Sequence, residues 1–167
     1  KGFLDCGMPM GRTSQVFDEF LQPRKLNGMG DYFEFDLMPR LEGLYRKDYT
    51  KHMDYNDDHK KETQYDAVIL SHAHIDHCGY IPFLRPEIPI YCTEATKLIM
   101  QTLDDTGNNV QYLTYKENFR IYENRNHTMS RANSTPNREE IPREFRIIQN
   151  GKKFNIDSIE VLPIEID

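Results

Sequence analysis

Residues 71–77, with the sequence SHAHIDH, constrain this chain more than any other segment. They hold three of the six histidines and a carboxylate, and they directly follow the apolar run 66–70 (DAVIL). A short apolar run bounded by polar residues is typical of a buried strand. We therefore expect a strand that ends in imidazoles and a carboxylate, the ligands that suit zinc and related divalent metals.

The spacing of these side chains indicates how they could meet. Positions two apart on an extended backbone point to the same face, so His72 and His74 can converge on one ion. Asp76 and His77 need a turn to face the same cavity, and Gly79 just beyond them permits a tight one. Two ligand pairs along a turning loop favour two metals over one. The competing interpretation is a polar turn with solvated histidines.

Such a pair of ions would carry hydrolytic chemistry. A bound metal lowers the pKa of water to roughly 7, which supplies a hydroxide nucleophile at neutral pH. The motif thus predicts a metal-dependent hydrolase with two divalent cofactor ions. Zinc ranks first, and manganese or iron stays an alternative because imidazole and carboxylate ligands accept all three.

The motif resembles that of the metallo-β-lactamase superfamily, whose signature His-x-His-x-Asp-His is complete in His72, His74, Asp76 and His77. The segment 3–7 (FLDCG) resembles the opening strand of that superfamily, which ends in an Asp before a Gly-containing turn. The resemblance implies an α/β (α+β) fold, as one part of an αββα sandwich with metals at the edge between two sheets.

The resemblance also implies a role for each residue. His72 and His74 would hold the first metal, and Asp76 and His77 would hold the second. Asp76 would in addition act catalytically by orienting the hydroxide. Asp5 would lie near the metals and orient their ligands without binding an ion, since such partners fix ligand orientation and basicity.

A narrower resemblance concerns the residues after the motif. The segment 77–84 (HCGYIPFL), followed by 89–93 (PIYCT) and an expected helix, is similar to the β-CASP and ribonuclease J-like nucleases. Those enzymes cut RNA phosphodiesters with two zinc ions, which implies an RNA substrate here. The net charge of −6 does not favour a broad nucleic-acid surface, although nucleases can concentrate positive charge locally.

Two alternatives to a ribonuclease stay open. One is an ester, thioester or lactam hydrolase that uses the same site. The other is a non-catalytic module with a partial metal site, because the superfamily has further metal-binding His and Asp residues later in the chain. Here the later histidine, His127, lies in a polar stretch and is a poor ligand candidate. We therefore expect a fragment whose remaining ligands lie beyond Asp167.

The domain prediction is a single, incomplete metallo-β-lactamase-like domain over 1–167, with insertions at about 24–64 and 108–144. The first insertion could form a small satellite core from Phe33, Phe35, Leu37, Met38 and Leu41. Strands are expected at 3–5, 66–70, 88–92 and 159–167, and helices at 13–21, 80–84 and 93–106. Ala95, Leu98, Ile99 and Leu103 share one face of the last helix. Segments 145–148 and 153–156 are expected to pair as a hairpin around Asn150-Gly151.

Composition excludes a membrane span, because no stretch approaches the roughly 20 apolar residues that a bilayer requires. Three cysteines without zinc-type spacing indicate reduced thiols and a cytoplasmic protein. An oligomer stays open, and the sequence does not distinguish the exact substrate or the metal.

Overall fold

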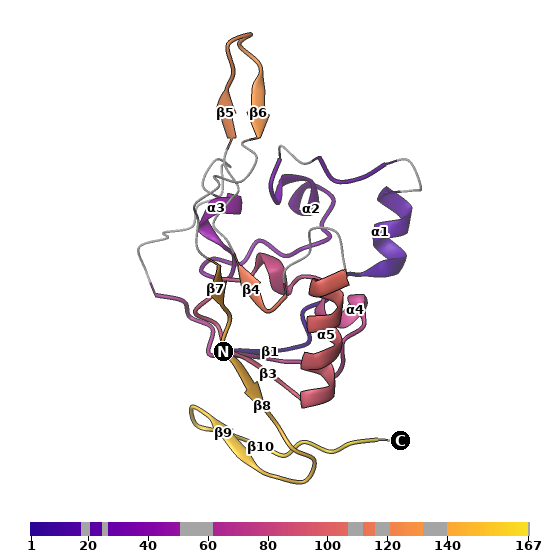
Figure 1. Ribbon diagram of the computed structural model, residues 1–167, viewed down its shortest axis with the longest axis vertical. Coiled ribbons are helices and arrows are strands. Elements are labelled where there is room, and N and C mark those ends of the chain that lie inside the picture. Colours follow the sequence, from indigo (N-terminus) through magenta and orange to yellow (C-terminus); the bar gives the residue numbers. More distant parts are fainter. Residues whose placement is uncertain are drawn as a thin grey trace.

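The computed structural model describes residues 1–17, 21–24, 27–50, 62–106, 112–115, 121–131 and 140–166, and the structural statements below concern these ranges. Its centre is a parallel sheet with the strand order β1-β2-β3-β8 (Figure 1). These strands are β1 (Gly2–Leu4), β2 (Ala67–Ile69), β3 (Ile90–Cys92) and β8 (Phe145–Ile147). The mixed α/β class expected from the sequence is confirmed.

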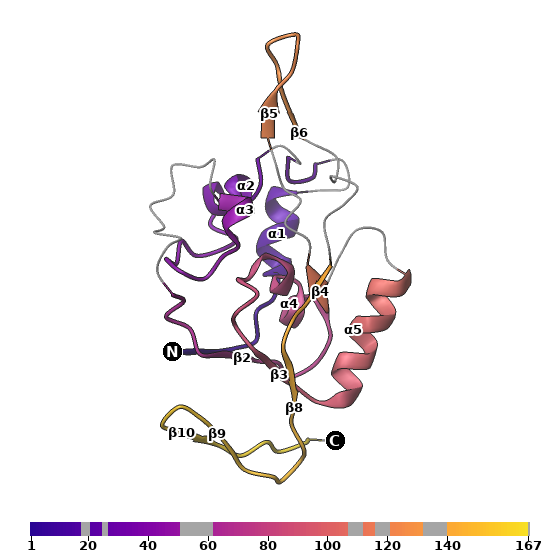
Figure 2. The ribbon, with the colours of Figure 1, turned by 60° about the vertical axis from the view of Figure 1, so that its left-hand side comes forward.

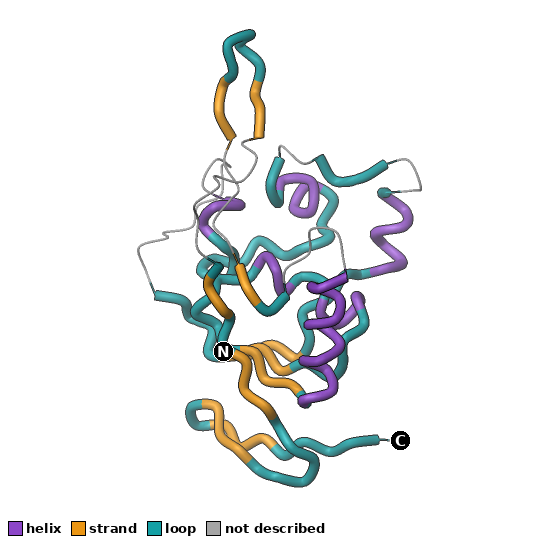
Figure 3. The backbone as a smooth tube through the Cα atoms, in the orientation of Figure 1, coloured by secondary structure: helices purple, strands orange, loops and turns teal. Residues whose placement is uncertain are grey.

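The remaining elements lie above, below and beside this sheet in the view of Figure 3. The helices are α1 (Met10–Val16), α2 (Gly30–Glu34), α3 (Lys47–Thr50), α4 (Ile75–Cys78), the 3₁₀ helix η1 (Ile81–Phe83) and α5 (Glu94–Thr106). The antiparallel pairs are β4 (Thr114–Tyr115) with β7 (Ile141–Pro142), β5 (Ile121–Glu123) with β6 (Met129–Arg131), and β9 (Phe154–Ile156) with β10 (Ile159–Val161). None of the helices within the described ranges has the length and apolar character needed to cross a bilayer.

One hydrophobic core joins the sheet to the segment that precedes it. Val68 and Ile90 are fully buried, as expected for strands of a parallel sheet with both faces covered. Phe33 and Met38 belong to the same cluster, so the described part of 24–64 does not form the separate satellite core expected from the sequence. Phe35, which was expected inside, is 43% exposed.

The expected hairpin around Asn150-Gly151 is wrong in its pairing. The turn forms, with Gly151 at a φ of 70°, but the two flanking strands lie in different sheets. β8 pairs in parallel with β3, whereas β9 pairs with β10 around a second turn in which Asp157 has a φ of 51°. The edge of β3 competes successfully for β8 because it extends a buried sheet.

Helix α5 begins where the sequence predicts, because the backbone N–H of Thr96 donates to the Thr93 hydroxyl at 3.2 Å. Its contact with the core differs from expectation. Thr96 and Met100, one turn apart, are its buried residues, whereas Leu98 and Ile99 are more than half exposed. The helix stands beside the sheet (Figure 2). The exposures of Leu98 and Ile99 show that its most apolar face is turned outward.

Helix α1 begins earlier than expected, at Met10. The Thr13 hydroxyl donates to the carbonyl of Pro9 at 2.9 Å, so Thr13 lies inside the helix instead of capping it. Phe17 follows the last helical residue with extended backbone, and the expected continuation through residues 18–20 lies outside the described residues.

Candidate metal centre

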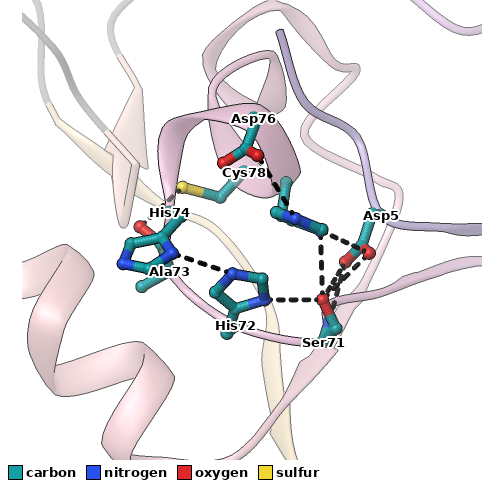
Figure 4. A network of polar contacts seen from close by, with 8 residues as sticks. Asp5, Ser71, His72, Ala73, His74, Asp76 and Cys78 are labelled. Atoms are coloured by element: carbon teal, nitrogen blue, oxygen red, sulfur yellow. Dashed lines mark hydrogen bonds and ion pairs between the residues drawn. The ribbon is translucent and has the colours of Figure 1, made fainter. Parts of the chain in front are cut away.

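The residues 71–77 leave the sheet at the carboxyl end of β2. Residues 71–74 form a loop, and His74 occupies the N-cap position of α4 with extended backbone (φ −72°, ψ 150°). Asp76 and His77 lie inside this short helix, which supplies the turn that the spacing requires (Figure 4). The carboxyl edge of an open α/β sheet is the usual place for a ligand site.

The first predicted ligand pair is brought together by this loop. Nε2 of His72 lies 3.0 Å from Nδ1 of His74, and the two ring centroids are 4.7 Å apart. Two nitrogens on one tetrahedral zinc are separated by roughly 3.3 Å, given Zn–N distances of about 2.0–2.1 Å. This pair therefore has the separation that a shared ion would impose.

The second predicted pair comes from α4. Nε2 of His77 lies 3.5 Å from Oδ2 of Asp76, again close to the separation set by a shared ion. The ring of His77 approaches that of His72 to 3.9 Å between centroids, so the two pairs are neighbours. Within the part of the chain that the structure describes, no three His, Cys, Asp or Glu side chains form a group that could hold an ion. What the described residues offer is two adjacent pairs, and their imidazole and carboxylate groups are donor types that suit divalent metals.

Asp5 reaches this centre from the end of β1. Its Oδ2 lies 2.8 Å from Nδ1 of His77, and its Oδ1 accepts from the backbone N–H of Ser71 at 2.7 Å. Asp5 has a φ of 60°, a conformation that Asp tolerates better than most residues. Its contacts are those of an orienting group, and its role toward a metal stays a prediction.

These contacts shift the pKa values of both partners. Burial raises the pKa of Asp5, but the hydrogen bonds from His77 and Ser71 more than offset it, so the pKa lies below its ordinary value. The hydrogen bond to Asp5 raises the pKa of His77 above its ordinary value. The carboxylate is therefore ionised at neutral pH and available as an acceptor.

Two glycines allow close backbone contacts at α4, Gly7 from the loop after β1 and Gly79 at the end of the helix itself. The backbone N–H of Cys6 donates to the carbonyl of His77 at 2.7 Å, and a Cβ on Gly7 would lie 1.8 Å from the carbonyl oxygen of Asp76. Gly79 lies in the turn that ends α4, but its φ of −59° is helical, so this turn does not use the positive φ that glycine permits. Gly79 is needed for close packing, because a Cβ there would lie 2.4 Å from the carbonyl oxygen of Ile75.

Ser71 is a residue of the centre that the sequence reasoning did not assign. Its hydroxyl lies within 3.2 Å of Asp5, His72 and His77. Figure 4 marks the contacts of Ser71 with Asp5 and His72 by dashed lines. The sequence signal that could have identified Ser71 is its hydroxyl at the strand end, directly before the first histidine.

His127, in contrast, lies exposed in the turn between β5 and β6. Cys78 is buried and its thiol contacts the carbonyl of Ala73 at 3.3 Å, which fits a packing role.

Comparison with known families agrees with this arrangement. Residues 50–154 match the family described as the beta-lactamase superfamily domain, which is more than half of the chain. The chain belongs to the metallo-β-lactamase superfamily. Members of this superfamily generally bind divalent metals. The recognition made from His72, His74, Asp76 and His77 is thereby confirmed, and the wider match places these residues inside the shared domain.

Similar proteins include an RNase J-like protein of Methanocaldococcus jannaschii, 43% identical over 75 residues that cover 35% of this chain and 18% of that protein. A transcription termination factor FttA of Lokiarchaeum sp. is 57% identical over 35 residues, 19% of this chain and 6% of that protein. Integrator complex subunit 11 of Gallus gallus is 38% identical over 68 residues, 31% of this chain and 11% of that protein. The chain thus spans less than a fifth of these relatives.

Among solved structures, a protein of unknown function from Enterococcus faecalis V583 has a TM-score of 0.59 and 23% identity to this chain. The likeness covers 95% of this chain and 30% of that one. At this identity it speaks for the fold alone, and it agrees with the mixed α/β layers described above.

Proposed function

We propose that the protein is a metal-dependent hydrolase that cleaves phosphodiester bonds in RNA. The observation that carries the proposal is the adjacency of two donor pairs, His72 with His74 and Asp76 with His77, at the carboxyl end of β2. Each pair has nearly the separation of two ligands on one ion, and each belongs to the signature of a superfamily that binds divalent metals.

Two ions, zinc first, would be held by these pairs. Bound divalent metals supply an activated water at neutral pH and neutralise charge that develops on a phosphate. His72 and His74 would fix the position of the first ion, and Asp76 and His77 would fix the position of the second. Asp76, the more exposed member of its pair, would in addition orient the attacking hydroxide.

RNA is proposed as the substrate because the relatives include an RNase J-like protein. Two further relatives are named as a transcription termination factor and as a subunit of the Integrator complex. These names favour a nucleic acid as the substrate class. A cytoplasmic location is proposed together with this function, and the free thiols of Cys6, Cys78 and Cys92 agree with it.

The test combines metal analysis with substrate panels. The purified protein should contain zinc or take up about two ions, and it should cleave bis-p-nitrophenyl phosphate and a labelled RNA. Hydrolysis of a lactam or thioester with no phosphodiester cleavage would replace the RNA proposal with the alternative hydrolase. Metal uptake with no hydrolysis of any of these substrates would point to the non-catalytic module.

Variants at two histidines separate the site from general effects. His74→Ala removes one donor of the first pair and should abolish hydrolysis while leaving the fold intact, since His74 is exposed. The matched control is His127→Asn, because His127 is also exposed and Asn tolerates its φ of 57°. Full activity of the His74 variant would contradict the assignment of the site.

A further inference from the structure

The Ser71 hydroxyl contacts three other side chains of the centre. It lies 2.9 Å and 3.0 Å from the two carboxylate oxygens of Asp5, 2.9 Å from Nδ1 of His72 and 3.2 Å from Nδ1 of His77. A hydroxyl has one proton to donate and two lone pairs that accept. The proton can therefore go to only one of these neighbours, and the choice decides where the imidazole protons lie.

The chemistry of Asp5 makes this choice. An ionised carboxylate only accepts hydrogen bonds, so Ser71 must donate its proton to Asp5 for the contact to be favourable. The oxygen of Ser71 then has lone pairs left, and Nδ1 of His72 must carry the proton that it accepts. In the same way, Nδ1 of His77 must carry a proton to donate to Oδ2 of Asp5 at 2.8 Å.

This arrangement leaves Nε2 of both imidazoles with a free lone pair. Nε2 of His72 is the atom that lies 3.0 Å from His74, and Nε2 of His77 is the atom that lies 3.5 Å from Asp76. In the opposite arrangement, Ser71 would donate to Nδ1 of His72. The single proton of the neutral imidazole would then lie on Nε2, the atom that faces His74. This arrangement would also remove one hydrogen bond from the Asp5 carboxylate.

We infer that Ser71 is a positioning residue that connects the charge of Asp5 to His72, so that a single carboxylate sets the tautomer of one imidazole in each donor pair. This inference rests on the proposed metal site. Ligating histidines commonly donate their second ring N–H to a carboxylate or another acceptor, which orients the ring and raises its basicity. His77 meets the carboxylate directly, whereas His72 reaches it only through Ser71.

The first measurement is metal affinity, by chelator competition for zinc in the intact protein. Ser71→Ala should bind zinc about 10- to 100-fold more weakly, the range typical for loss of such an outer partner. Ser71→Thr keeps the hydroxyl and should stay within about threefold of the unmodified protein, because the same hydrogen bonds can form. Ser14→Ala is the matched control, since Ser14 is an exposed serine of α1 whose hydroxyl donates to the nearby carbonyl of Gly11.

The second measurement reads the tautomers directly and needs no metal. Nitrogen-15 NMR of labelled histidines in the metal-free protein at slightly alkaline pH should show His72 protonated at Nδ1. Ser71→Ala should shift His72 toward a mixture of tautomers and leave the circular dichroism spectrum unchanged. A purely structural role for Ser71 would not move this signal selectively at His72.

The outcomes separate this inference from the proposed function. If the unmodified protein binds no metal, the proposed function fails, and the tautomer of His72 still decides the role of Ser71. Unchanged zinc affinity together with an unchanged tautomer in Ser71→Ala would overturn the inference. Weaker binding in both Ser71 variants with the tautomer retained would overturn it too, because the loss would then come from packing.

Discussion

Nδ1 of His77 lies 2.8 Å from Oδ2 of Asp5, although 72 residues separate them in sequence. The contact exists because β1 and β2 are parallel neighbours, whose carboxyl ends meet at one edge of the sheet. The loop after β1 and helix α4 therefore form a single structural unit around the donor pairs. A substitution in either segment should therefore alter the side-chain positions in the other.

Replacing Asp5 by Asn should weaken metal binding by about 10- to 100-fold, because a neutral amide lacks the negative charge that Asp5 presents to His77 and Ser71. The measurement is zinc competition with a chelator. Asp36→Asn is the control, since Asp36 is an exposed aspartate at a positive φ of 50° whose ion pair with Arg12 lies at the surface. Equal affinity of the Asp5 and Asp36 variants would remove Asp5 from the centre.

Gly7→Ala should destabilise the protein by about 1–3 kcal/mol and disturb the donor pairs, because a Cβ would overlap the carbonyl of Asp76. Chemical denaturation measures the free energy of unfolding, and histidine NMR shifts report on the pairs. Gly11→Ala is the matched control, because a Cβ on Gly11 meets nothing within 4 Å. If both variants unfold at the same denaturant concentration, the close packing of the loop on α4 is wrong.

Two leucines distinguish the core from the exposed face of α5. Leu84 is fully buried, so Leu84→Ala should cost about 2–5 kcal/mol of stability. Leu98 is 55% exposed, and Leu98→Ala should change the free energy of unfolding by no more than about 0.5 kcal/mol. Thermal and urea unfolding of both variants give the comparison. A large loss at Leu98 would mean that this face is covered in the protein.

The carboxylate of Asp31 should make stability depend on pH. Hydrogen bonds from Arg24, at 2.5 Å and 3.0 Å, hold the pKa of Asp31 below its ordinary value of 3.8, and Asn27 adds a further bond at 2.7 Å. A lowered folded-state pKa contributes stability above the unfolded value, and this contribution is lost as the pH falls through the folded value. Asp31→Asn should therefore cost about 1–3 kcal/mol at neutral pH, since the carboxylate is buried.

Unfolding of the unmodified protein and the Asp31 variant at neutral pH and near pH 3 checks this sign. The difference between them should shrink at the lower pH, because the Asp31 carboxylate of the unfolded chain takes up a proton there, whereas the folded state keeps its lowered pKa. A difference that stays constant or grows on acidification would contradict the ion pair with Arg24.

Much of the site could be predicted because its ligands are neighbours in sequence. The alternation of His72 and His74 at the end of an apolar run places both side chains together on any strand-to-loop exit. The strands 67–69 and 90–92 and the cap at Thr93 were predictable for the same reason, since hydrophobic pattern and local hydrogen bonds decide them. The domain boundaries, the insertions and the metal roles of the ligands stay predictions.

Other features depended on partners far away in the chain. Local turn chemistry favoured a hairpin around Gly151, yet strand pairing with β3 decided the neighbour of β8. The outward face of α5 followed from the fit of Met100 into the core and not from the count of apolar residues.

The sequence by itself determined which chemical groups stand at the end of β2, because hydrophobic pattern and ligand spacing are local properties. Only the tertiary structure decided that Asp5 and Ser71 share one hydrogen-bond network with His72 and His77. The physical reason is that these hydrogen bonds form only when the two strand ends lie side by side. The register of β1 against β2 decides this, and it depends on residues that are distant in sequence.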